Sequence, residues 1–269
     1  MTEEGTTDAD GIDPRPIKGT VSFSELKTSG GLPDTSEIEV SMEHPPATTD
    51  LNPTTADEFG EICHEVLHRG AGGATTVADW RRECDRVLAR IDPSENTAER
   101  VLTVVTGLGP RLAQLGTVEY TERTFGFRCN GWYVTGDIDA LIVRDNGRVI
   151  VLDFKTGAPA NIHPFQLSLY ILACERDVSL RTKLPGPVTD GAFLLVDGNG
   201  TTTLISLEET DAPVELTAIE RELVATLDAF ETKAKQFERY STEMDCSSSS
   251  LITSRHRSRV STTGVHRRS

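Results

Sequence analysis

The feature that most constrains the fold is an apolar strand that ends in charge. Residues 149–152, Val-Ile-Val-Leu, are apolar enough for the core of a sheet, and they lead into Asp153 and Lys155. A buried ionised side chain loses its hydration and needs a counter-charge in compensation. An earlier β-branched run carries a second acid, Asp139. We therefore expect two neighbouring strands that bring charged groups to one place.

The turn between these strands decides whether the two acids meet. The tripeptide at 145–147, Asp-Asn-Gly, is a hairpin signal. A two-residue loop would place Asp139 opposite Phe154. A three-residue loop with a left-handed Gly147 would place Asp139 opposite Asp153, with Cβ atoms about 4.5–5.5 Å apart. The second register sets polar residues opposite each other.

Two carboxylates at that separation suit a hard divalent cation. Without one they repel, and one pKa rises. Mg²⁺ takes oxygen ligands, commonly one or two carboxylates with water and phosphate oxygens. Lys155 shares a face with Asp153 and can offset charge on an attacking hydroxide or on a phosphate. The alternative is a structural ion pair of Asp153 and Lys155 at the sheet rim, with Asp139 solvated in a loop.

Two predicted helices add polar candidates. His64 lies at the edge of an apolar helix face, so it is either an ordinary half-buried histidine or a metal ligand that reaches the sheet. Gln166 and Tyr170 are spaced i, i+4 and share a face of another helix. Three roles fit this pair: a polar contact at a helix–sheet boundary, hydrogen bonds to a DNA phosphate, or support for Lys155.

The order of elements predicts an α/β, mixed α+β domain with one central mixed sheet. Apolar periodicity and turn residues give three helices, a three-stranded meander, a helix, a hairpin and a long helix, over residues 54–70, 80–91, 96–115, 117–155, 163–177, 191–207 and 213–240.

Three regions are expected along the chain. Residues 1–53 form an acidic, largely disordered lead-in and loop, in which 19–26 could be a short strand or the start of a helix. Residues 54–240 form the folded domain. Residues 241–269 form a basic, Ser/Arg-rich disordered tail, which is either an arm that contacts nucleic acid or the product of a shifted reading frame.

Composition excludes several classes of protein. No apolar run approaches the roughly 20 residues of a membrane span, and the acidic N-terminus is unlike a secretory signal, so we expect a cytoplasmic protein without membrane contact. The five cysteines are scattered with no CxxC pair, which excludes an evident disulfide or metal-cysteine framework.

Taken together in order, four motifs resemble the RecB/AddA nuclease domain of the PD-(D/E)xK superfamily. They are FGEICHEVLH, GDIDAL, VLDFKTG and QLSLY, within residues 54–175. The resemblance implies a restriction-endonuclease-like core, a central mixed sheet flanked by helices. It also implies a Mg²⁺- or Mn²⁺-dependent nuclease of the exonuclease kind that hydrolyses DNA phosphodiester bonds in repair and recombination. Nucleases of this family commonly accompany a helicase, so the resemblance implies a free-standing nuclease, the partner of a helicase subunit, or a detached fragment.

The resemblance also assigns roles to positions. Asp139, Asp153 and Lys155 are catalytic. The metal is held by His64, Asp139, Asp153 and the backbone carbonyl of Phe154, and DNA is contacted by Gln166 and Tyr170. Asp137 falls on a variable position of the motif. Some relatives bind an iron–sulfur cluster through four cysteines, three of them close together near the C-terminus, but this chain has only Cys246 there, so no cluster is expected.

Two other functions remain open at this point. One is a nuclease-like fold kept as a DNA-binding or assembly module without catalysis, against which the intact acids and lysine argue. The other is a structure-specific endonuclease, which would differ in the shape of its DNA substrate.

The charge balance predicts a halophilic protein. The net charge is -15, and only six of the 27 basic residues are lysines. At molar salt the Debye length is about 3 Å, so an acidic surface hardly repels an anionic partner. We expect the melting temperature to rise with KCl concentration. Thermal melts from low to molar KCl test this, and an unchanged or reduced stability would refute it.

Overall fold

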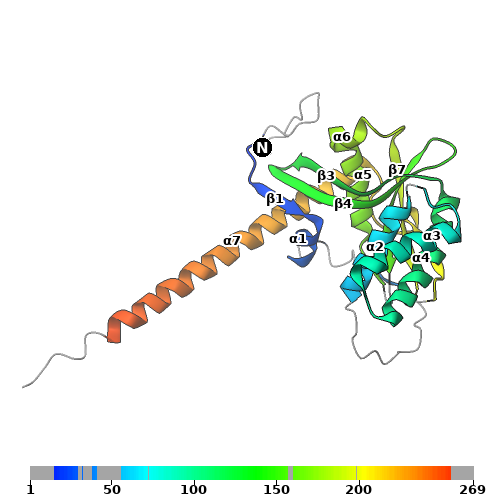
Figure 1. The fold of residues 1–269 in the computed structure, drawn as a ribbon. Helices are drawn as coiled ribbons and strands as arrows, with labels where there is room; N and C mark the ends of the chain where they lie inside the picture. The colour runs from blue at the N-terminus through cyan, green and yellow to red at the C-terminus, as the bar shows by residue number, and fades with distance from the viewer. Residues whose placement is uncertain are drawn as a thin grey trace, which may run out of the picture. The chain divides into compact units, whose positions relative to one another are not determined.

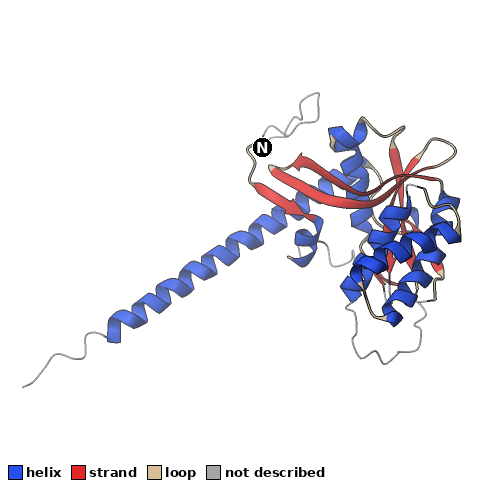
Figure 2. Ribbon diagram, in the orientation of Figure 1, coloured by secondary structure: helices blue, strands red, loops and turns tan. Residues whose placement is uncertain are grey.

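The computed structural model describes residues 15–29, 32, 38–40, 56–71, 73–156, 160–197 and 199–255. Its helices are α1 (Phe23–Thr28), α2 (Ala56–Ala71), α3 (Val77–Ile91), α4 (Glu95–Leu115), α5 (Pro164–Arg176), α6 (Val178–Arg181) and α7 (Leu216–Arg255). Its strands are β1 (Gly19–Ser22), β2 (Ile38–Val40), β3 (Thr117–Cys129), β4 (Trp132–Val143), β5 (Val149–Thr156), β6 (Ala160–Ile162), β7 (Val188–Val196) and β8 (Thr202–Ser206) (Figure 2). The chain forms two compact units, Met1–Leu227 and Asp228–Ser269.

A mixed six-stranded sheet is the centre of the first unit. β3 pairs antiparallel with β4 along one edge. The other edge of β4 is shared, because β1 pairs in parallel with residues 132–135 and β5 pairs antiparallel with residues 140–143. β7 continues the sheet in parallel to β5, and β8 follows antiparallel. Figure 1 shows α2, α3 and α4 packed together beside the sheet. The predicted fold class, a mixed sheet flanked by helices, is confirmed.

The register of the β4–β5 hairpin is the one that sets the acids opposite each other. Ala140 pairs with Leu152 and Val143 with Val149. Gly147 has a φ of 77°, the left-handed conformation that a three-residue loop requires. Within β5, even-numbered residues such as Leu152 and Phe154 pack into the core with α2–α4, so the odd-numbered ones face the other side.

Residues 19–28 form β1 and α1 of the first unit, whereas the predicted folded domain begins at residue 54. Ser22 caps α1: its hydroxyl accepts from the Glu25 N–H at 3.3 Å, and the Glu25 carboxylate accepts from the Ser22 N–H at 2.7 Å. Val21 and Leu26 are fully buried. Pairing with β4 and this burial hold the segment in place. Residues 1–14 and 41–55, predicted as disorder and loop, lie outside the described residues.

α7 also differs from the prediction, because it continues to Arg255 instead of ending near Tyr240. No glycine or proline occurs in Leu216–Arg255, so the sequence contains no strong helix breaker there. The tail predicted to be disordered from residue 241 is therefore helical to Arg255, and residues 256–269 lie outside the described part of the chain.

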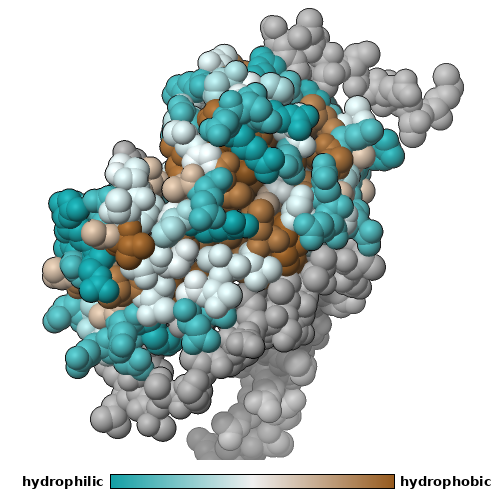
Figure 3. Space-filling view, turned by 90° about the vertical axis from the view of Figure 1, so that its right-hand side faces the viewer, coloured by the Kyte–Doolittle hydropathy of each residue, from teal (hydrophilic) through white to brown (hydrophobic). Residues whose placement is uncertain are grey.

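Figure 3 shows one face of the molecule. Hydrophilic side chains cover much of the face in Figure 3, with apolar residues visible between them. Among the helices of the described ranges, none has both the length and the apolarity needed to cross a bilayer.

Trp80 of α3 packs closely against both α2 and α4. Its side chain on α3 is 1% exposed. A Cβ added at Gly70 of α2 would lie 2.0 Å from the indole ring, and one added at Gly109 of α4 would lie 2.3 Å from it. Both helices approach the indole so closely because these two residues lack a side chain. The position of α2, which carries His64, therefore depends on this contact.

We expect Gly70→Ala to destabilise the protein by about 1–3 kcal/mol, because overpacking against the indole outweighs the roughly 1 kcal/mol gain in helix propensity. Urea denaturation followed by tryptophan fluorescence measures this change. Gly73→Ala is the matched control, since a Cβ there meets nothing within 4 Å. Equal stability of the two variants would contradict the proposed role of this close packing.

Candidate active site

β4 and β5 separate where the two acids lie. Their ladder ends at Ala140 and Leu152. Beyond it, the Asp139 carboxylate accepts a hydrogen bond from the Phe154 N–H at 2.7 Å. A side-chain oxygen thus replaces the backbone carbonyl that would otherwise pair with β5. Asp153 stands opposite Asp139 in this register and is 1% exposed. The structure brings these two predicted acids together.

Lys155 forms an ion pair with Asp153. Its Nζ lies 2.6 Å from Asp153 Oδ2, and its side chain is 27% exposed. Burial alone would lower the pKa of Lys155, but the charge and hydrogen bond of Asp153, with a contribution from Asp139, raise it above its ordinary value. The ammonium group therefore stays charged while part of it remains open to solvent.

His64 reaches the same place from α2. Its ring makes an edge contact with the Phe154 ring, with centroids 5.9 Å apart. Its Nδ1 lies 3.1 Å from Glu122 Oε1. Burial opposes protonation of the imidazole, but the Glu122 hydrogen bond and the charges of Asp139, Glu122 and Asp153 raise the pKa of His64 overall. The histidine predicted at a helix edge thus borders the acids.

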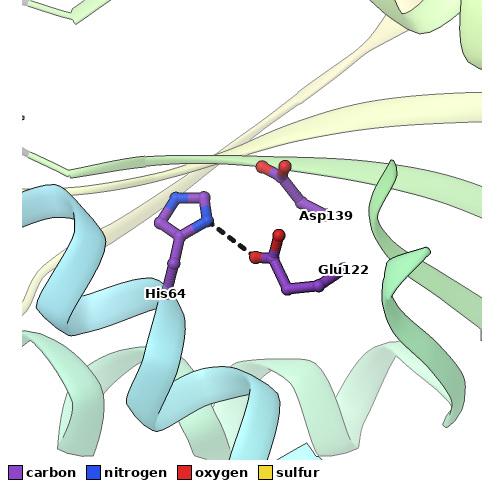
Figure 4. Close-up of side chains that lie close together, drawn as sticks. All are labelled: His64, Glu122 and Asp139. Carbon is purple, nitrogen blue, oxygen red and sulfur yellow. Dashed lines mark hydrogen bonds and ion pairs between the residues drawn. The ribbon is translucent and has the colours of Figure 1, made fainter. Parts of the chain in front are cut away.

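Glu122 of β3 is a site residue that the sequence did not reveal. One ligand atom each from His64, Glu122 and Asp139 lie within 4.8 Å of one another (Figure 4). Thr121 pairs with Ala140 and Arg123 with Ile138, so Glu122 stands opposite Asp139. The turn at 130–131, Asn-Gly, was the available signal. Counting back from it, with Cys129 paired to Trp132, sets Glu122 opposite Asp139, because the register is constant as far as Tyr120.

The closeness of the acids perturbs the titration of Asp139. Burial and the neighbouring charge of Asp153 raise the pKa of Asp139 to about 7, although His64, the Phe154 N–H and Lys155 act in the opposite direction. This is the expected result for paired carboxylates without a bound cation. Asp137, two residues earlier on β4, is exposed and accepts a hydrogen bond from Thr124 Oγ1 at 2.6 Å.

Gln166 and Tyr170 lie on α5 and bind each other. The Gln166 amide nitrogen donates to the Tyr170 hydroxyl at 2.6 Å. The Tyr170 side chain is 3% exposed and packs edge-on against Phe125, with centroids 6.0 Å apart. Burial, followed by the charges of Asp153 and Asp139, raises the pKa of Tyr170 well above its ordinary value. The phenol is therefore a neutral, buried neighbour of the acids.

An open cavity of about 690 Å³ is bordered by His64, Glu122 and Lys155. Its walls come from α2, β3 and the end of β5, namely Gly60, Glu61, His64, Glu65, Glu122, Phe154, Lys155 and Thr156. Gly60 leaves space beside Thr156 in this wall. A Cβ added at Gly60 would meet only Thr156 Oγ1, at an ordinary contact distance of 3.5 Å.

The sequence matches a family model described as the PD-(D/E)XK nuclease superfamily over residues 39–249. The chain belongs to this superfamily. The match covers the strand-end acids and Lys155. It does not resolve the RecB/AddA subtype, which stays a prediction. A comparison with curated proteins gave no match.

Two solved structures are similar to this superfamily member. One is SSO0001, with 17% identity over 76% of this chain and 82% of that chain, and a TM-score of 0.29. The other bears the name "Putative exonuclease" and comes from Eubacterium rectale, with 9% identity over 68% and 70% of the two chains and a TM-score of 0.41.

The paired acids of this nuclease domain lead us to expect that its folding stability depends on pH. The pKa of Asp139 rises from 3.8 to about 7 in the folded protein, so ionising Asp139 costs stability as pH rises through this window. In EDTA at pH 8, we expect Asp139→Asn to be more stable than the wild type by at least about 1 kcal/mol. The gain should vanish near pH 4. Urea denaturation at both pH values measures it.

Asp137→Asn is the control, because that exposed acid on the same strand has no second acid opposite it. The Asp139→Asn variant keeps an oxygen that can accept from the Phe154 N–H. A gain that is the same at pH 4 and pH 8 would mean that carboxylate repulsion is not its cause.

Proposed function

We propose that this protein is a Mg²⁺- or Mn²⁺-dependent nuclease that hydrolyses DNA phosphodiester bonds. The observation that carries the proposal is the joint position of Asp139, Asp153 and Lys155 at the parting of β4 and β5. A core strand gains no stability from two facing acids, so the arrangement is better suited to binding a cation than to holding the fold.

The residues present fit a hard divalent ion. The donors are carboxylate oxygens and an imidazole, which suit Mg²⁺ and Mn²⁺. They come from separate elements, His64 from α2 and Asp139 from β4, and they lie close together beside an open cavity that His64 lines. Asp153 and the carbonyl of Phe154 complete the proposed ligand set. When bound, the ion would polarise a phosphate oxygen and lower the pKa of water beside it.

Lys155 would act on the charge that develops during cleavage. Its ammonium is held 2.6 Å from Asp153 Oδ2 and lies in the cavity wall. From there it can offset negative charge on the attacking oxygen or on the phosphate. Asp153 fixes the lysine in that position, so loss of either side chain would remove the preorganised charge.

Tyr170 and Gln166 would support the site from the α5 side. The phenol is buried, so we assign it a positioning role beside Asp139 and Asp153. Gln166 is half-buried and holds the phenol through its amide. Of the two, Gln166 is the better placed to meet a DNA strand.

The resemblance to RecB/AddA extends the proposal. It supports an exonuclease that acts on DNA ends during repair and recombination, with a helicase supplying unwound DNA. It also supports a cytoplasmic location. The acidic composition supports action in concentrated salt, where the anionic strand approaches a screened surface.

With Mn²⁺, the purified full chain should degrade labelled linear DNA and leave circular duplex DNA intact. We expect Asp153→Ala and Lys155→Ala to lower the rate by about 10²–10³-fold or more, because each removes charge that is preorganised for the transition state. Gel assays with single-stranded, linear duplex and circular substrates measure this.

Lys183→Ala is the matched control for the lysine, because Lys183 is exposed and lies outside the cavity. Unchanged activity in the Asp153 or Lys155 variant would overturn the assignment of the site. Cleavage of circular DNA would point to an endonuclease, and a wild-type protein that binds DNA without cutting it would favour the inactive module.

A further inference from the structure

Glu122 is without a role in the site proposed so far, although it stands at its centre. It is the only carboxylate of β3 that approaches both His64 and Asp139 among the described residues. Its side chain is 38% exposed and lines the cavity. We propose that Glu122 is a direct ligand of the divalent ion, together with His64 and Asp139. This inference rests on the proposed function, because it concerns the ion of that site.

The spacing of the three side chains fits one coordination shell. Ligands of Mg²⁺ lie at about 2.1 Å from the ion, so two of them on opposite sides are about 4.2 Å apart. The ligand atoms of His64, Glu122 and Asp139 lie within 4.8 Å of one another. Figure 4 shows them converging from a helix and two strands. Small side-chain movements would close this set around an ion.

The backbone places Glu122 for this contact. Its φ of 48° is left-handed, which is uncommon for a residue other than glycine and departs from the extended strand on either side. The register sets it opposite Asp139, between the pairs Thr121–Ala140 and Arg123–Ile138. Asp139 already uses Oδ2 to accept from the Phe154 N–H, which leaves its other oxygen for a cation shared with Glu122.

Charge also favours a cation beside Glu122. Glu65 in the same cavity wall is neutralised by Arg69 at 2.6 Å and Arg90 at 3.2 Å. Glu122, in contrast, has no arginine or lysine partner among the described residues, and its ion-pair contact is with His64. A phosphate entering this cavity would meet a carboxylate that has no arginine or lysine partner among the described residues, so a cation held there lowers the repulsion.

A different role is conceivable on the same contact. A carboxylate that accepts from the Nδ1–H of a histidine can orient the ring and leave the other nitrogen for the metal. The two roles require different properties of the Glu122 side chain. A direct ligand needs the negative oxygen, whereas an orienting residue needs only an acceptor, which a glutamine amide also provides.

Calorimetric titration of the metal-free full chain with Mn²⁺ separates these roles. We expect Glu122→Gln to weaken Mn²⁺ binding at least ~10-fold, because the ligand charge is lost while the shape and the acceptor remain. Glu119→Gln is the matched control, an exposed acid on the same strand outside the cavity, and should bind within about twofold of the wild type. Circular dichroism melts check that each variant is folded.

Each other outcome overturns the inference. If Glu122→Gln binds Mn²⁺ like the wild type while Glu122→Ala binds weakly, Glu122 only orients His64. If both bind normally and the wild type cleaves DNA, this inference fails and the proposed function stands. If the wild type itself binds no Mn²⁺, both fail together.

Discussion

The site depends on the hydrogen bond from the Phe154 N–H to Asp139. Ordinary pairing of β4 and β5 stops at Ala140 and Leu152, and beyond that point a side chain replaces the backbone as the acceptor. The strands can therefore part without leaving a buried N–H unsatisfied. Their parting admits His64 from one face of the sheet and lets Tyr170 approach from the other. The approach of both side chains to the acids therefore depends on the Asp139 carboxylate acting as acceptor in place of a backbone carbonyl.

The same arrangement has an electrostatic cost in the absence of a cation. Asp139 and Asp153 face each other, and Lys155 pairs with Asp153, so Asp139 is left with a pKa of about 7. A folded state that resists ionisation of its own acid is less stable at neutral pH than it could be. Binding of a dication would relieve the cost, and metal affinity and folding would be linked.

Local patterns were sufficient to predict much of this from the sequence. The Asp-Asn-Gly turn allowed two registers, and matching polar with polar residues favoured the one in which Asp139 meets Asp153. Helix periodicity placed His64 at an apolar edge. Glu122 was missed although the register counted back from the Asn-Gly turn is constant as far as Tyr120, because the left-handed conformation at residue 122 breaks the alternation on which side-chain facing is predicted. β1 was left undecided because its partner, β4, lies more than a hundred residues later, and no local signal reports such pairing.

The pairing of β1 has a practical meaning for work on this chain. It occupies the first part of an edge of β4 whose last part is bonded to β5. A shortened protein that begins at residue 54 would lose that strand, and the backbone groups of residues 132–135 would face solvent. Bare strand edges recruit other chains, so such a fragment would tend to self-associate through β4 even with every site residue intact.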